Sequence, residues 1–150
     1  MTLIDRQRTS VLFIDMQDRL VPEVELGDQV ASMCERLMAW LGDQQAGVVV
    51  TEHCVDKLGN TVFEVPKTAA CLDKTAFSAI KEHSVQVVAS QQQVIVCGME
   101  SHVCVLQTVM DLLVAEKQVF VVSDLVASRD PIDRTVALAR LGCRPLEWLL

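Results

Sequence analysis

A cysteine near the start of a predicted helix is the strongest candidate for chemistry in this sequence. Residues 94–97 are apolar and mostly β-branched, which is typical of a buried parallel strand, and Gly98 gives the freedom that a sharp strand-to-helix turn needs. With Ser101 as N-cap, Cys104 is the third helical residue, where free N–H groups and the helix dipole favour a thiolate. We therefore expect a thiol pKa below about 8.5 and partial exposure. The alternative is a small buried hydrophobe, as most unpaired intracellular cysteines are.

The helix that carries this cysteine should turn one apolar stripe towards the core. Residues at helical spacing form that stripe, namely Val103, Leu106, Val109, Met110, Leu113 and Val114. Cys104 lies off the stripe, on the side that it shares with Thr108 and Asp111. This pattern predicts that the thiol points away from the hydrophobic core.

Two charged residues stand at the ends of other predicted strands. Asp15 ends the apolar run 11–14, and the carboxyl ends of parallel strands form the crevice where open α/β sheets bind ligands. Lys74 follows a short strand that begins at residue 70. Taken alone, Asp15 is as readily a turn or capping residue, and Lys74 a solvated surface charge. The turn after residue 14 lacks the G-x-G-x-x-G pattern, so we expect no nicotinamide or flavin cofactor.

Composition narrows the function classes. The chain has 150 residues, the size of one domain, and its net charge of −7 repels nucleic acids and anionic membranes. It shows no signal peptide and no run of transmembrane length, so we expect a soluble, cytoplasmic protein. The six cysteines form no C-x-x-C pair and should be reduced thiols. His53 has no second histidine at ligand spacing, so we predict no metal site.

The remaining pattern alternates strands and helices. A helix over 30–41 precedes a buried strand over 48–51, which together with the first strand gives a right-handed parallel unit. A further strand over 119–122 precedes a helix that has Asp130 as N-cap and Pro131 at its first position. Residues 143–150 could add one short edge strand, although Pro145 weakens that prediction.

Three segments resemble, in order and spacing, the signature segments of the isochorismatase-like cysteine hydrolases. These are Phe13-Ile-Asp-Met-Gln17, Asp73-Lys-Thr-Ala-Phe-Ser78 and Gly98-Met-Glu-Ser-His-Val-Cys-Val105. Further segments resemble the subgroup called isochorismatase domain-containing proteins, namely Val50-Thr-Glu52, Leu58-Gly-Asn-Thr-Val62 and Ser123-Asp-x-x-x-Ser-Arg129. The resemblance implies a three-layer αβα, Rossmann-like fold with a parallel sheet of strand order 3-2-1-4-5-6. It also implies a dimer or larger homo-oligomer.

The resemblance further implies an Asp-Lys-Cys triad. In it Asp15 is the general base, Lys74 orients that base and stabilises a thiolate, and Cys104 is the nucleophile. A cis peptide bond is implied between Met99 and Glu100, with an oxyanion hole built from the backbone N–H groups of Glu100 and Cys104. Within the same three segments, we predict that the substrate contacts are Gln17, Phe77 and His102.

These features predict a cysteine-dependent hydrolase of a small amide or related carbonyl substrate, acting through a thioester and without metal or organic cofactor. The chain is shorter than this family usually is, with the regions near 65–74 and 140–147 compressed. The leading alternative is therefore a non-catalytic binding or interaction protein that keeps the hydrolase fold. A third hypothesis is a redox-responsive thiol protein, because an exposed cysteine of low pKa is easily oxidised.

Overall fold

The structure is a computed structural model that describes residues 3–42, 47–82, 85 and 90–142. Its strands are β1 (Thr9–Ile14), β2 (Gly47–His53), β3 (Ala70–Lys74), β4 (Gln93–Met99) and β5 (Gln118–Ala127). The helices are α1 (Gly27–Gly42), α2 (Val55–Leu58), α4 (Leu106–Val114) and α5 (Pro131–Arg140), with a π-helical turn η4 (Ser101–Val105) directly before α4. Short 3-10 turns are η1 (Arg6–Arg8), η2 (Val21–Glu23) and η3 (Ala79–Lys81).

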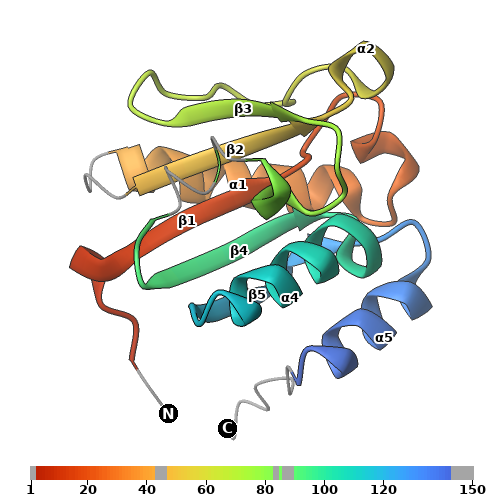
Figure 1. Ribbon diagram of the computed structural model, residues 1–150. Helices are drawn as coiled ribbons and strands as arrows, with labels where there is room; N and C mark the ends of the chain where they lie inside the picture. Colours follow the sequence, from red (N-terminus) through yellow and green to blue (C-terminus); the bar gives the residue numbers. More distant parts are fainter. Residues whose placement is uncertain (1–2, 43–46, 83–84, 86–89, 143–150) are drawn as a thin grey trace, which may run out of the picture.

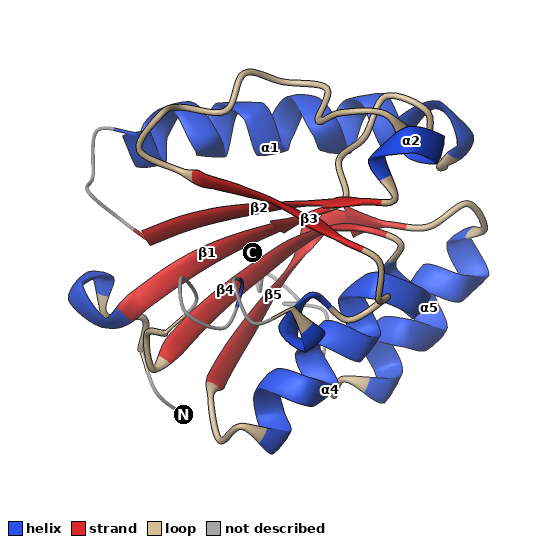
Figure 2. Ribbon diagram, turned by 45° about the horizontal axis from the view of Figure 1, so that its top comes forward, coloured by secondary structure: helices blue, strands red, loops and turns tan. Residues whose placement is uncertain are grey.

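The five described strands form one parallel sheet in the order β3-β2-β1-β4-β5. Helix α1 covers one face, and α4 and α5 cover the other, which gives the three predicted layers (Figures 1 and 2). The sheet order confirms the predicted fold for these strands. A sixth strand was predicted within 143–150, which lies outside the described residues. None of the helices in the described part of the chain is both long and apolar enough to cross a membrane.

The centre of the sheet is almost entirely apolar, because both of its faces are covered. Every residue of β1 is buried. Six apolar side chains of α1 pack against one face as buried or partly buried residues, namely Val30, Met33, Cys34, Leu37, Met38 and Leu41. The other face packs against α4 through a separate cluster. This rigid centre places the carboxyl ends of β1, β2 and β3 side by side, since Ile14 pairs with Thr51 and His53 pairs with Lys74.

Gly98 lies inside β4 rather than in the turn after it. Its backbone has a φ of +128°, and an added Cβ would come within 2.1 Å of the Ile14 carbonyl oxygen on β1. Glycine is therefore required here for the close approach of two strands as well as for its backbone conformation. The strand continues to Met99, and the peptide bond between Met99 and Glu100 is cis, as the family resemblance implied.

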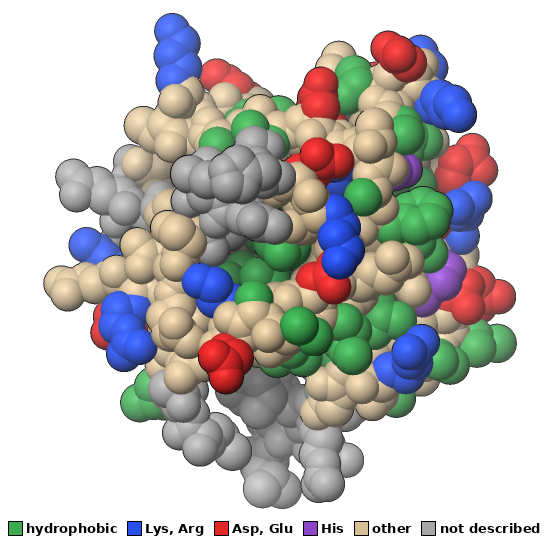
Figure 3. All heavy atoms as spheres, in the orientation of Figure 1, with side chains coloured by type: hydrophobic (Ala, Val, Ile, Leu, Met, Phe, Trp, Pro, Cys, Tyr) green, Lys and Arg blue, Asp and Glu red, His purple; other side chains and the backbone are tan. Residues whose placement is uncertain are grey.

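The predicted apolar stripe of α4 was wrong in part. Met110, Leu113 and Val114 are exposed, and Figure 3 shows hydrophobic side chains gathered over this helix. The buried face instead carries Cys104, Val105, Thr108, Val109 and Leu112. Apolar residues occur on both sides of this helix, so their spacing did not determine which side packs against the sheet.

Candidate active site

Asp15, Lys74 and Cys104 converge at the carboxyl edge of the sheet. Asp15 directly follows β1, Lys74 is the last residue of β3, and Cys104 lies in η4 after β4. The Lys74 Nζ atom is 2.7 Å from Asp15 Oδ2 and 3.6 Å from Cys104 Sγ. The three residues are only 0%, 2% and 5% exposed, in the order Asp15, Lys74 and Cys104. The structure thus brings together three side chains that the sequence separates by up to 89 positions.

Backbone oxygens hold the Lys74 ammonium in place. Its Nζ donates hydrogen bonds to the carbonyl oxygens of Ala76 and Phe77, each at 3.2 Å, in addition to its contacts with Asp15 and Cys104. A buried ammonium is tolerated only when it is paired and hydrogen-bonded. The loop after β3 therefore fixes the cation between the carboxylate and the thiol.

Asp15 is held just as firmly. Its backbone has a φ of +53°, an uncommon conformation for a residue other than glycine, and its N–H donates to the Thr51 carbonyl oxygen at 3.0 Å. The Thr51 hydroxyl donates to Asp15 Oδ1 at 2.9 Å, which leaves Oδ2 towards Lys74. Burial raises the pKa of the Asp15 carboxyl above its usual value, and the neighbouring Lys74 opposes that rise. This favours a carboxylate that accepts a proton more readily than an exposed aspartate does.

The predicted low pKa of Cys104 was wrong, as was its predicted exposure. Burial raises the pKa of this thiol to about 12, and the nearby Asp15 charge adds to the rise while Lys74 opposes it. The predicted cap differs too, because Glu100 is the N-cap of η4 and the Ser101 hydroxyl donates to the Ala127 carbonyl oxygen at 2.9 Å. The raised pKa favours the protonated thiol, so a base must take its proton during attack.

The three predicted substrate contacts differ in their surroundings. Gln17 is fully buried, and its side-chain amide bonds to the backbone of His53 and Gly59, so it ties two loops together rather than reaching a substrate. The Phe77 side chain is exposed, and the residue belongs to the loop after β3 whose carbonyl oxygens hold Lys74. His102 is partly buried in η4, with its Nδ1 atom 3.1 Å from the Ser128 hydroxyl. Phe77 thus keeps an exposed side chain on the loop that holds Lys74, whereas the His102 ring lies against Ser128 and has its Nε2 atom 3.6 Å from Asp133.

His53 lies near the site, although its spacing in the sequence indicated no role for it there. Its ring lies 5.5 Å from that of Phe77, and its Nε2 atom is 3.6 Å from Cys54 Sγ. Burial lowers its pKa, with Lys74 adding to the effect, so the imidazole is neutral at pH 7. Its position at the end of a strand beside Asp15 was the signal that could have identified it.

The order in which an alkylating reagent modifies the cysteines should follow the exposure and the pKa of each thiol. We expect limiting iodoacetamide near neutral pH to modify Cys54 before Cys104, because Cys54 is partly exposed beside a neutral imidazole, whereas Cys104 is buried with a raised pKa. Cys71 is exposed, but burial of its thiol and Glu52 raise its pKa to about 11, so it serves as an exposed control. Peptide mapping measures the order. Modification of Cys104 ahead of Cys54 would contradict the burial described here.

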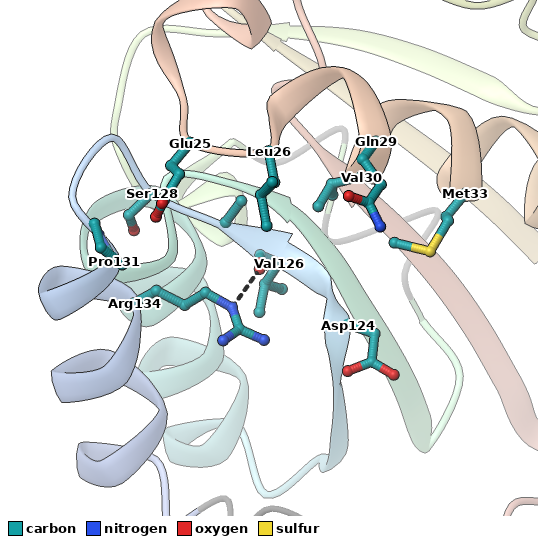
Figure 4. A pocket seen from close by; sticks show the side chains of 11 residues that line it. Glu25, Leu26, Gln29, Val30, Met33, Asp124, Val126, Ser128, Pro131 and Arg134 are labelled. Atoms are coloured by element: carbon teal, nitrogen blue, oxygen red, sulfur yellow. Dashed lines mark hydrogen bonds between the residues drawn. The ribbon is translucent and has the colours of Figure 1, made fainter.

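A groove of about 450 Å³ lies away from the triad, between α1, β5 and α5 (Figure 4). Arg134 lines it and donates from Nε to the Val126 carbonyl oxygen at 2.9 Å. None of the triad residues lines this groove.

Within the described ranges, no three His, Cys, Asp or Glu side chains gather in a way that could hold a metal ion. The five cysteines in those ranges are all free thiols, as predicted.

Two curated proteins are similar in sequence to most of this chain. Isochorismatase domain-containing protein 2 of Rattus norvegicus is 34% identical over 137 residues, which cover 89% of this chain and 65% of the rat protein. Isochorismatase domain-containing protein 1 of Danio rerio is 36% identical over 140 residues, which cover 89% of this chain and 50% of the fish protein. The chain thus spans between half and about two thirds of the length of these relatives.

A solved structure agrees in fold. The MAR1 ribonuclease of Caenorhabditis elegans superposes with a TM-score of 0.88 at 29% sequence identity, over 94% of this chain and 76% of the worm protein. Residues 9–146 also match the family model described as the isochorismatase domain. Together with the two curated relatives, this match shows that the chain belongs to the isochorismatase family.

Proposed function

We propose that this protein is a cysteine hydrolase of a small amide or related carbonyl compound, acting through a covalent thioester. The observation that carries the proposal is the contact of one buried ammonium, Lys74 Nζ, with both the Asp15 carboxylate at 2.7 Å and the Cys104 sulfur at 3.6 Å. A nucleophile, a base and an orienting cation in contact are the parts that covalent acyl transfer needs. Membership of a hydrolase-like family supports the reaction class.

The first step is attack on the carbonyl carbon. Asp15 takes the proton of the Cys104 thiol as the sulfur–carbon bond forms, and Lys74 stabilises the negative charge on the sulfur as the proton leaves. The carbonyl oxygen becomes an oxyanion, for which we propose the backbone N–H groups of Glu100 and Cys104 as donors. Because the pKa of the Cys104 thiol is raised, the attack needs a general base beside the thiol to remove its proton, and Asp15 occupies that position.

The tetrahedral intermediate then expels its leaving group. Asp15 gives the proton to the departing nitrogen, so that an amide releases ammonia or an amine and leaves a thioester on Cys104. Asp15 next takes a proton from water as the water oxygen attacks the thioester carbon. The carbon–sulfur bond then breaks to release the acid, and Asp15 returns its proton to the Cys104 sulfur. Every step uses groups of this chain. Because the triad residues are at most 5% exposed, only a compact carbonyl group can reach the sulfur.

Ribonuclease activity, which the name of the worm protein states, is not part of this proposal. The net charge of −7 opposes binding of a polyanion, which depends on basic side chains at the phosphates.

We also propose that the protein acts in the cytoplasm as a homo-oligomer. The exposed apolar side chains of α4 and α5, Met110, Leu113, Val114, Ile132 and Val136, support self-association. Light scattering that gives a monomer mass would contradict it.

Turnover of a panel of small primary amides, followed by ammonia release, tests the proposed function. We expect at least one amide to be hydrolysed by the wild-type protein, with activity retained in the presence of a chelator. The matched control is the Asp15→Asn variant, which keeps the size of the side chain but cannot act as the base. Binding of panel compounds without turnover would favour the non-catalytic alternative. Peroxide oxidation of Cys104 without turnover would favour the redox alternative.

The pH dependence should report the raised pKa of Asp15. The base must be ionised, so kcat/KM should fall as the pH decreases through the pKa of this carboxyl, at a higher pH than the 3.8 of an ordinary aspartate. Burial is the cause, because it disfavours the charged form. The pH profile of kcat/KM for a hydrolysed amide measures it. An acid limb at or below pH 3.8 would contradict the account.

A further inference from the structure

The side-chain carboxylate of Glu100 is buried and has no role in the proposed reaction, which uses only the backbone N–H of this residue. The residue is 4% exposed, and its Oε1 atom accepts a hydrogen bond from Arg129 Nε at 2.6 Å. Its Oε2 atom accepts from the Arg129 backbone N–H at 3.1 Å, and His102 Nδ1 is 3.7 Å from the same oxygen. Charge-assisted bonds from both the side chain and the backbone of one arginine fix this carboxylate in position.

The same residue also caps the turn that carries the nucleophile. The Glu100 carbonyl oxygen accepts from the backbone N–H groups of Val103 at 3.2 Å and Val105 at 3.1 Å, on either side of Cys104. The main chain of Glu100 thus holds η4, while its side chain holds the loop after β5. A shift of that loop would pass through Glu100 to the backbone next to Cys104.

Two serines add a second tie between these segments. The Ser128 hydroxyl accepts from the Ser101 N–H at 3.1 Å and lies 3.1 Å from His102 Nδ1. The Ser101 hydroxyl donates to the Ala127 carbonyl oxygen at 2.9 Å. Residues 127–129 therefore contact each of residues 100–102. These bonds add to the pairing of β4 with β5, in which Met99 lies opposite Ala127.

We infer that Glu100 and Arg129 are positioning residues that hold the Cys104 turn, and its backbone N–H groups, at the geometry for carbonyl attack. The inference rests on the proposed function. The Arg129 side chain is 66% exposed, and its contacts within the described residues are with Glu100, through which it would act. Acyl transfer is sensitive to such placement, because a displacement of about 1 Å can cost about 10²-fold in rate.

Reversible addition of carbonyl-¹³C propanal to Cys104, followed by NMR, tests the inference without an identified substrate. The sulfur–carbon bond forms as the thiol proton moves to the former carbonyl oxygen, which gives a hemithioacetal. We expect Arg129→Ala to weaken the adduct about 10-fold and Arg129→Lys to restore part of the affinity. The matched control is Arg134→Ala, because Arg134 donates to the β5 carbonyl oxygens of Val126 and Ser123 instead.

Iodoacetamide labelling of Cys104 separates positioning from loosening, since this displacement creates no tetrahedral carbon whose oxygen could accept hydrogen bonds from the Glu100 and Cys104 N–H groups. We expect its rate in Arg129→Ala to stay within about twofold of wild type, whereas a merely structural role would expose the buried thiol and accelerate labelling. Equal propanal affinity in wild type and Arg129→Ala, or weakened affinity with accelerated labelling, would overturn the inference alone. Absence of a Cys104 adduct in the wild type would overturn the proposed function and the inference with it.

Discussion

Replacing Cys104 with alanine is expected to lower kcat/KM for a hydrolysed amide by at least ~10³-fold, because it removes the thiol that lies against Lys74 and Asp15. The fold should survive, since the change removes one small buried side chain from the edge of the core. Turnover of the purified variant and its thermal unfolding measure both effects. The Cys104→Ala variant should thus lose nearly all of its activity while it keeps its fold.

Cys97→Ala is the matched control for this prediction. Cys97 lies in β4, is buried, and bonds weakly to the Leu12 carbonyl oxygen at 3.6 Å. It shares the burial of Cys104, but its contacts within the described residues are with Leu12 and Cys34 rather than with Asp15. Its pKa is raised by burial well above the usual value. We expect this variant to lose some stability and to keep its kcat/KM within about threefold of wild type. Equal loss of turnover in both variants would mean that packing, not nucleophilic attack, explains the effect of Cys104→Ala.

Replacing Lys74 with methionine should destabilise the protein by ~3–5 kcal/mol, because it leaves the fully buried Asp15 carboxylate without its cation. The Lys74→Met/Asp15→Asn double variant should recover much of this loss, because the unpaired charge is then gone. Urea unfolding measures the free energies. If the double variant is less stable than Lys74→Met, the buried ion pair is not the source of the destabilisation.

The effect of Lys74→Met should also depend on pH. With Lys74 removed, the largest opposition to the rise in the Asp15 pKa that burial causes is lost, and only the smaller effects of the Cys104 and Thr51 hydrogen bonds still oppose it. The folded-state pKa therefore lies further above the unfolded value. The destabilisation is then largest above the folded pKa and shrinks as the pH falls through it, because the buried carboxyl becomes neutral. The control is Lys81→Met, whose ammonium is 3.3 Å from Asp111 on a side chain that is 65% exposed. This surface pair should contribute less than about 1 kcal/mol.

Much of the fold was predictable from short-range pattern. Apolar runs bounded by turn residues predicted the buried strands, and the cap at Asp130 is confirmed, since its carboxylate accepts from the Ile132 N–H at 2.8 Å. The strand over 119–122 is longer than predicted, because β5 continues to Ala127 after an irregularity opposite residues 96–98 of β4. Pairing with a neighbouring strand decides where a strand ends, and the local sequence does not contain that information.

The position of the site was more predictable than its electrostatics. Asp15 and Lys74 were identified because they end strands, and those ends meet at one edge of a parallel sheet. The pKa of Cys104 was mispredicted because helix-start position favours a thiolate, whereas burial beside Asp15 outweighs that effect. The Glu100–Arg129 pair was not predicted at all. Its partners are 29 positions apart, and no spacing rule links them.

Mass spectrometry of the acid-quenched protein during turnover of a hydrolysed amide tests the central claim most directly. Acid stops deacylation by protonating Asp15, so the thioester should be trapped. The account predicts that peptide mapping finds the acyl group of the substrate on Cys104 of the wild type and not in Asp15→Asn. Continued turnover with no acyl group on Cys104, or with the acyl group on another residue, would contradict it.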